Sequence, residues 1–212
     1  MRALLACLLL LRAAPLPAQQ TFDYTLSIQQ GGREIGREDY SVRPGSRTGG
    51  SLITARSRYP ASSPTLQIRT TQERSPDGAI AKFELDVQGP EGNVVILAAG
   101  SGARLIVRSV TKGSEAGREL PGGRDLVLLD DRVFSLYLAI ADAATAGVAR
   151  LTAVYPRSGR RATIVARREP GPEGATIQLS GDVTGSLIVD AQGRLQRLDL
   201  PAPSILVTPV GK

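Results

Sequence analysis

The side chains of this sequence that could do chemistry are four aspartates in one part of the chain, Asp125, Asp130, Asp131 and Asp142. Glycoside hydrolysis needs one carboxyl group as an acid and another as a base or nucleophile, about 5 to 10 Å apart. A second interpretation is open, because an aspartate just before a helix accepts hydrogen bonds from free N–H groups of the helix. These residues therefore predict either a carboxylate-dependent glycan hydrolase or a helix cap.

Two further patterns have simpler structural interpretations. Glu84 and Asp86 are two positions apart, so on a strand they share one face, and a solvated face explains them. Ser109 and Lys112 match the Ser-x-x-Lys pattern, in which a lysine activates a serine nucleophile. Residues three apart on a strand point to opposite faces, and this segment is expected to be a strand. Neither pattern therefore predicts a catalytic site.

The residue types that the chain lacks exclude several classes of chemistry. It has no histidine and a single cysteine, Cys7. Histidine general bases, the Ser-His-Asp triad and zinc sites are therefore excluded. No glycine-rich phosphate loop is present, and Asp130 and Asp131 lack the alternating oxygen ligands of a calcium loop. The sequence predicts no cofactor, no metal and no enzyme of a common type.

Residues 1–18 have the features of a secretory signal peptide. Arg2 supplies a positive charge, residues 3–11 are apolar, and residues 15–18 end in small side chains suited to cleavage. The apolar run is shorter than the ~20 residues that cross a bilayer, so we expect no transmembrane segment. Export to the periplasm or the exterior of a Gram-negative bacterium argues against nucleic acid as a partner, although the formal net charge is +6.

Residues 19–200 predict one domain of antiparallel β structure. Short alternating or β-branched segments recur about every ten residues, separated by Gly, Pro, Ser and Asp. Because the connecting turns are short, neighbours in sequence should pair. We expect a meander of about 11–12 strands curled into an open half-barrel. A polar loop at 112–123 should interrupt it, and residues 201–212, with three prolines, should form an extended tail or edge segment.

The period changes in one segment, which predicts a helix at about 131–146. Asp130 or Asp131 would cap its start, and Gly147 would end it. Apolar residues there recur at the i, i+3, i+4 and i+7 spacing of a buried helix face, and such a helix would pack on the concave face of a curved sheet. This apolar face comprises Val133, Phe134, Tyr137, Leu138, Ile140, Ala141 and Ala144.

Three segments together resemble a known family. Residues 22–36 contain Phe-Asp-Tyr-Thr-Leu and Gly-Gly-Arg-Glu-Ile-Gly, residues 128–134 read Leu-Leu-Asp-Asp-Arg-Val-Phe, and residues 189–201 begin Val-Asp-Ala-Gln-Gly-Arg-Leu. They look like a family of uncharacterised secreted bacterial domains that is similar in architecture to the periplasmic lipoprotein-carrier half-barrels. The resemblance implies a groove for acyl chains or another apolar ligand. The chain departs from the carriers in having one evident helix and few aromatic residues, which leaves less material for a large cavity.

Three functions remain open. The leading hypothesis is an exported, non-enzymatic envelope protein that binds a lipid, another apolar ligand or an acylated partner between helix and sheet. The second is an interaction or scaffold module that contacts another envelope protein, and the third is the glycan hydrolase. The residues predicted to line the ligand groove are Val133, Phe134, Tyr137, Leu138, Ile140 and Ala141.

Overall fold

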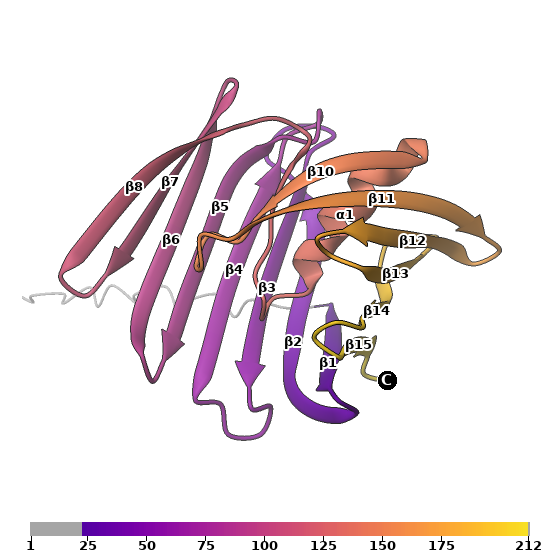
Figure 1. Cartoon of the computed structure of the whole chain (residues 1–212), viewed down its shortest axis with the longest axis horizontal. Coiled ribbons are helices and arrows are strands. Elements are labelled where there is room, and N and C mark those ends of the chain that lie inside the picture. Colours follow the sequence, from indigo (N-terminus) through magenta and orange to yellow (C-terminus); the bar gives the residue numbers. More distant parts are fainter. Residues whose placement is uncertain (1–22, 212) are drawn as a thin grey trace, which may run out of the picture.

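The computed structural model describes residues 23–211, in which one sheet of fifteen strands curls almost into a barrel (Figure 1). The predicted signal peptide lies outside the described residues. Strands β8 to β1 lie side by side in reverse order, and β15 to β9 follow on from β1. The strands are β1 (Tyr24–Gln30), β2 (Arg33–Pro44), β3 (Ser51–Tyr59), β4 (Leu66–Arg74), β5 (Ile80–Gly89), β6 (Gly92–Ser101), β7 (Arg104–Thr111), β8 (Ser114–Pro121), β9 (Leu126–Leu128), β10 (Val148–Val154), β11 (Arg161–Gly171), β12 (Gly174–Gly181), β13 (Gly185–Asp190), β14 (Leu195–Leu200) and β15 (Ile205–Pro209).

Strands β1 to β8 form an antiparallel meander because a short connection joins each strand to the next. In the first connection, Gly31 and Gly32 have φ values of 57° and 78°, which glycine adopts without steric cost. Alternate residues of each strand face the inside of the barrel. On β5, for example, Phe83, Leu85 and Val87 are buried while the residues between them are partly exposed. The period-2 pattern of the sequence thus decides which side chains form the core.

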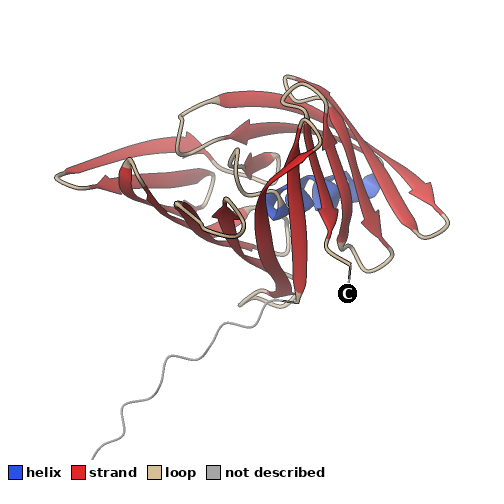
Figure 2. Cartoon of the chain, turned by 90° about the horizontal axis from the view of Figure 1, so that it is seen from below, coloured by secondary structure: helices blue, strands red, loops and turns tan. Residues whose placement is uncertain are grey.

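The helical segment lies inside the barrel, on the concave face of the sheet (Figure 2). It consists of a 3-10 turn η1 (Ser135–Tyr137), the α-helix α1 (Leu138–Ala143) and a 3-10 turn η2 (Ala144–Ala146). Every residue of the predicted apolar face is buried, and so are Leu136 and Ala139. The segment is covered on more than one side because it contacts β3 as well as β10 and β11. The predicted fold class, mainly β with one central helix, is confirmed.

The sheet has more strands than the expected 11 or 12 because three segments pair that lack a strong strand pattern. β8 lies where a polar loop was predicted at 112–123. Leu120 is its only buried residue, so β8 has no apolar alternation to reveal it. β9 is three residues long and pairs in parallel with β10. The third of these strands is β15.

β15 replaces the extended tail that was predicted for residues 201–212. It pairs antiparallel with β1 on one side and with β14 on the other, so it is a central strand. Its residues Ile205 and Val207 are buried in the core. The chain turns back just before β15, where the N–H of Ser204 donates to the carbonyl of Pro201 at 2.9 Å. β15 therefore joins the two halves of the barrel.

Neither Asp130 nor Asp131 caps the helix, which corrects the prediction. The helical segment begins only at Ser135, and the side chain of the preceding residue, Phe134, makes no capping hydrogen bond. Instead, the carboxylate of Glu38 on β2 accepts the backbone N–H groups of Phe134 and Ser135 at 2.7 and 2.8 Å. Inside the barrel, η1 contacts β3, and β3 pairs with β2. The start of η1 is therefore close to Glu38 on β2, although the two are far apart in the sequence.

Candidate ligand-binding pocket

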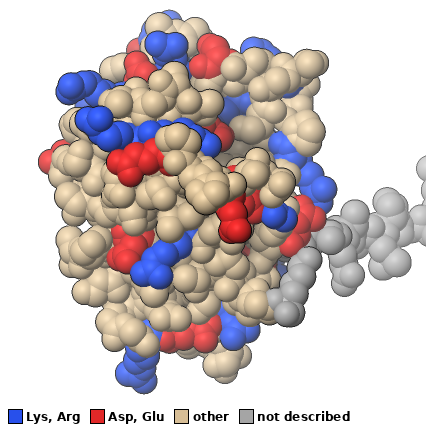
Figure 3. All heavy atoms as spheres, turned by 90° about the vertical axis from the view of Figure 1, so that its right-hand side faces the viewer, with Lys and Arg blue, Asp and Glu red and all other residues tan. Residues whose placement is uncertain are grey.

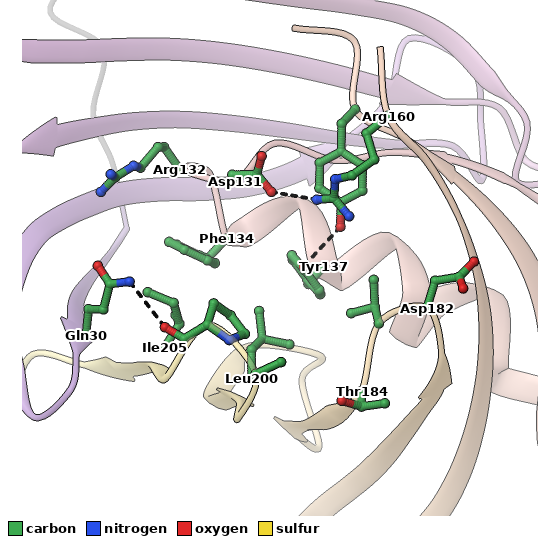
Figure 4. A pocket seen from close by; sticks show the side chains of 14 residues that line it. Gln30, Asp131, Arg132, Phe134, Tyr137, Arg160, Asp182, Thr184, Leu200 and Ile205 are labelled. Atoms are coloured by element: carbon green, nitrogen blue, oxygen red, sulfur yellow. Dashed lines mark hydrogen bonds and ion pairs between the residues drawn. The ribbon is translucent and has the colours of Figure 1, made fainter. Parts of the chain in front are cut away.

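A pocket of about 380 Å³ opens beside the start of the helical segment (Figure 4). It lies where the end of β1 and the β10–β11, β12–β13 and β14–β15 connections meet the helix. These segments are far apart in sequence, so the pocket forms only when the barrel has folded. Its lining residues are Gln30, Asp131, Arg132, Phe134, Tyr137, Tyr155, Arg160, Asp182, Val183, Thr184, Leu200, Ala202, Pro203 and Ile205.

The interior of the pocket is apolar. Phe134, just before the helical segment, and Tyr137 within it form one wall, with ring centroids 6.4 Å apart. Leu200 and Ile205 lie across from them (Figure 4), and Val183 adds a third aliphatic side chain. These three aliphatic residues keep 5%, 7% and 9% of their surface exposed, whereas most core residues keep less. The pocket thus exposes apolar surface that the rest of the core covers.

Charged side chains surround the mouth of this pocket. Arg160 pairs with Asp131 at 2.7 Å (Figure 4). The guanidinium carbon of Arg160 lies 3.4 Å from the centre of the Tyr155 ring. The hydroxyl oxygens of Tyr155 and Tyr137 are 3.5 Å apart. Burial, assisted by the proximity of Tyr155, raises the pKa of Tyr137, so the Tyr137 hydroxyl keeps its proton. A ligand would meet this neutral hydroxyl beside the charged rim.

Arg132 occupies another part of the rim and is held by Tyr59. Its guanidinium carbon lies 5.0 Å from the centre of the Tyr59 ring, and its backbone carbonyl accepts the Tyr59 hydroxyl at 2.7 Å. Burial raises the pKa of Tyr59, so this hydroxyl remains a donor. In the part of the chain that the structure describes, Arg132 forms no ion pair with a carboxylate. Its positive charge is therefore oriented but not neutralised.

Two buried carboxylates fix the segment that carries Arg132 and Phe134. Asp130 accepts Nε and Nη2 of Arg157 at 3.0 and 2.9 Å, and the backbone N–H of Arg132 at 2.9 Å. Glu38 accepts the N–H of Phe134 from the other side. Burial raises the pKa of both carboxyl groups, and the hydrogen bonds that they accept oppose this rise. One wall and part of the rim are thereby anchored to the barrel.

Of the six residues predicted to line a groove, the structure places Phe134 and Tyr137 in the pocket. The remaining four point elsewhere because the sheet surrounds the helical segment. Ala141 borders a separate polar depression of about 390 Å³ at the far end of the helix. The other three, Val133, Leu138 and Ile140, are buried in the core.

The carboxylates considered for a hydrolase are not gathered at one site. Asp131 is at the mouth of the pocket, whereas Asp130 is buried and engaged by Arg157. Asp125 and Asp142 line a different, polar depression of about 730 Å³. The other residues considered, Glu84, Asp86, Ser109 and Lys112, lie on β5, on β7 and in the turn after β7, and do not line the pocket.

Sequence reasoning missed the pocket residues that lie outside the helix. Tyr155 and Arg160 flank the β10–β11 turn, Val183 lies in the β12–β13 turn, and Ala202 lies in the β14–β15 turn. Turn residues of these types are common and carry no signal of ligand binding. Only the pairing of the strands brings these turns to one end of the barrel.

Within residues 23–211, no three His, Cys, Asp or Glu side chains are arranged to hold a metal ion, and no helix is long and apolar enough to cross a membrane. Basic and acidic side chains are interspersed over the face shown in Figure 3. No family model, curated protein or solved structure matches this chain. The chemistry of the pocket is therefore the ground on which a function can be proposed.

Proposed function

We propose that this protein is an exported, non-enzymatic binding protein that shelters a small apolar ligand, or the acyl group of a partner, in the pocket beside the helix. The observation that carries the proposal is a pocket of about 380 Å³ whose facing walls, formed by Phe134, Tyr137, Val183, Leu200 and Ile205, are apolar. Ligand pockets span ~300 to 1,000 Å³, so this one is near the lower limit. Its size suits one hydrocarbon chain or ring and not a lipid with several chains.

The two walls supply the driving force for binding. Burial of apolar surface contributes about 25 cal/mol for each Å² removed from water, and the rings of Phe134 and Tyr137 face aliphatic side chains across the pocket. The mouth is different, because Asp131, Arg132 and Arg160 line it. An amphipathic ligand matches this division, with its apolar part inside and its polar end at the rim. A uniformly polar ligand such as a sugar would make few apolar contacts with these walls.

The test is the binding of a single-chain probe to the purified protein. Mass spectrometry should reveal an apolar molecule that co-purifies, and a fluorescent fatty acid should bind with one-to-one stoichiometry. Ala202→Trp places a large ring in the exposed turn that lines the pocket, and should lower the affinity about tenfold or more by filling the site. Ala191→Trp places the same ring in an exposed turn outside this pocket, and should bind like the wild type.

Two results would overturn the proposal. One is a wild-type protein that carries no apolar molecule and binds no probe. The other is equal binding by the wild type, Ala202→Trp and Ala191→Trp, which would show that the probe attaches elsewhere. Thermal melting of both variants separates a filled pocket from a damaged fold.

The free edge of β8 favours a second candidate, an interaction module. β8 pairs with β7 alone, so its other edge can accept a strand of a partner protein. In the β7–β8 register Ser109 pairs with Ala116, so the N–H of the next residue, Gly117, faces the free edge. Gly117→Pro would remove this N–H group and, for this candidate, should abolish capture of a partner from an envelope extract while leaving probe binding unchanged. Ala202→Trp should have the opposite effects if the pocket is the functional site.

A further inference from the structure

We infer that the ligand carries an anionic group, a carboxylate or a phosphate, which Arg132 and Arg33 bind just outside the pocket; this inference rests on the proposed function. The apolar part of the ligand would fill the pocket, and the anion would lie in a neighbouring depression. The class of ligand is therefore a single-chain anionic amphiphile.

The geometry that supports this inference is a second depression that shares Arg132 with the pocket. It measures about 450 Å³, is more open, and is lined by Arg33, Tyr59 and Leu66 among others. The β1–β2 hairpin also reaches both sites, because Gln30 lines the pocket while its cross-strand partner Arg33 lines the depression. A ligand that leaves the pocket past Arg132 therefore arrives beside Arg33.

The charges of the depression favour an anion. Among the described residues, neither Arg33 nor Arg132 forms an ion pair, whereas Arg37 pairs with Glu34 at 2.7 Å. Glu34 is the acidic residue of the depression, and the hydrogen bond from Arg37 lowers its pKa and occupies its carboxylate. An incoming anion would therefore meet two guanidinium groups without displacing a protein carboxylate.

The guanidinium group of Arg132 is pre-oriented, so less conformational entropy is lost when it binds an anion. Arg132 is held over the ring of Tyr59 and at its own backbone carbonyl, both by the same tyrosine. A planar guanidinium in a fixed position can donate two parallel hydrogen bonds to a carboxylate or a phosphate. A cationic head group would instead face two positive charges, and a neutral one would gain only the apolar contacts.

The experiment compares four probes that share a ten-carbon chain, in calorimetric titrations of the wild-type protein below their critical micelle concentrations. Decanoate and decyl phosphate should bind about tenfold or more tightly than decanol, and decyltrimethylammonium should bind weakest. Added NaCl should reduce the advantage of the two anions, because salt screens exposed charges. Arg132→Gln and Arg33→Gln should each reduce that advantage, and Arg132→Lys should restore part of it at its position.

Arg69→Gln is the matched control, because Arg69 is exposed, forms no ion pair with any residue between 23 and 211, and lines neither site. It should keep the full preference for anions. Equal affinities for decanol and decanoate would overturn this inference while leaving the proposed function in place. Failure of all four probes would overturn both. Sedimentation with phosphatidylglycerol vesicles without binding of monomeric decanoate would also overturn the inference, because it would show adsorption to a charged surface.

Discussion

At the scale of single residues, Glu38 connects the sheet to the pocket. Its fully buried carboxylate accepts N–H groups from Phe134 and Ser135, and also the Ser57 hydroxyl at 3.2 Å. Phe134 forms part of the pocket wall, so one strand residue positions a ligand contact. Nothing near Glu38 in the sequence marks it as a cap, because it is 96 residues from Phe134.

The titration of Glu38 should be visible in the stability of the protein. Burial raises the pKa of Glu38, so the folded state binds more protons than the unfolded state above the unfolded pKa of ~4.3. Its stabilising contribution is therefore complete below that pH and is lost as the pH rises through the folded pKa. We expect the free energy of unfolding of the wild type to fall relative to that of Glu38→Gln as the pH increases from about 4. Urea unfolding at a series of pH values measures this difference.

Two comparisons complete the Glu38 experiment. Glu38→Ala leaves the N–H groups of Phe134 and Ser135 without their acceptor, and should lower the free energy of unfolding by about 2 kcal/mol or more. Glu91→Gln, in an exposed turn, controls for the loss of a carboxylate in general. A pH-independent difference between the wild type and Glu38→Gln would contradict the prediction.

At the scale of secondary structure elements, β15 and the helical segment complete the barrel in different ways. β15 closes the sheet by pairing with β1 and β14, and the helical segment fills the interior. Both depend on distant parts of the chain. β15 pairs with β1 from the other end of the chain, and the helical segment contacts β3 from the first half. The pocket lies where these elements meet, between Tyr137 of the helical segment and Ile205 of β15.

Deletion of residues 205–212 should therefore prevent cooperative folding. It removes two ladders of backbone hydrogen bonds and the buried side chains of Ile205 and Val207, and it exposes the edges of β1 and β14. Deletion of residues 211–212 is the control, because it keeps β15 and the backbone hydrogen bond from the N–H of Val210 to the carbonyl of Thr25 on β1. Thermal unfolding followed by circular dichroism should show a single cooperative transition for the control and none for the longer deletion. Similar transitions for both proteins would show that β15 is dispensable.

At the scale of the whole molecule, the barrel has a seam between β8 and β9. These strands are consecutive in sequence but lie at opposite ends of the strand order, so residues 122–125 cross from one edge of the sheet to the other. The strands do not pair across this gap. A side-chain bond bridges it instead, where Nη2 of Arg118 on β8 donates to the carbonyl of Pro156 after β10 at 3.1 Å.

We expect β8 to open locally more often than the other strands of the first half, since it is hydrogen-bonded on one side only. Arg118→Met keeps the length of the side chain but removes the bond to Pro156. Hydrogen exchange should then become faster at the β8 amides, while the free energy of global unfolding changes by less than about 1 kcal/mol. Arg104→Met, which removes an exposed ion pair with Glu119 inside the β7–β8 hairpin, is the control. Unchanged β8 exchange in Arg118→Met would show that this bond does not hold the seam.

Local patterns in the sequence were sufficient to predict the fold class and most of the strands. Alternation of apolar residues identifies strands such as β1 and β5, and the change of period before Gly147 identifies the helix. β8 and β15 were not predicted as strands, for different reasons. β8 is solvated over almost its whole length. β15 follows a turn with two prolines, Pro201 and Pro203, which predicted an extended tail or an edge segment.

The candidate site depended on tertiary structure for all but two of its residues. Phe134 and Tyr137 were predictable because the periodicity of a helix is set by residues close together in the chain. The cap by Glu38, the pairing of Arg160 with Asp131 and the shared position of Arg132 depend on contacts between segments far apart in sequence. Residues in separate turns leave no joint pattern in the sequence, and strand pairing alone decides which turns come together.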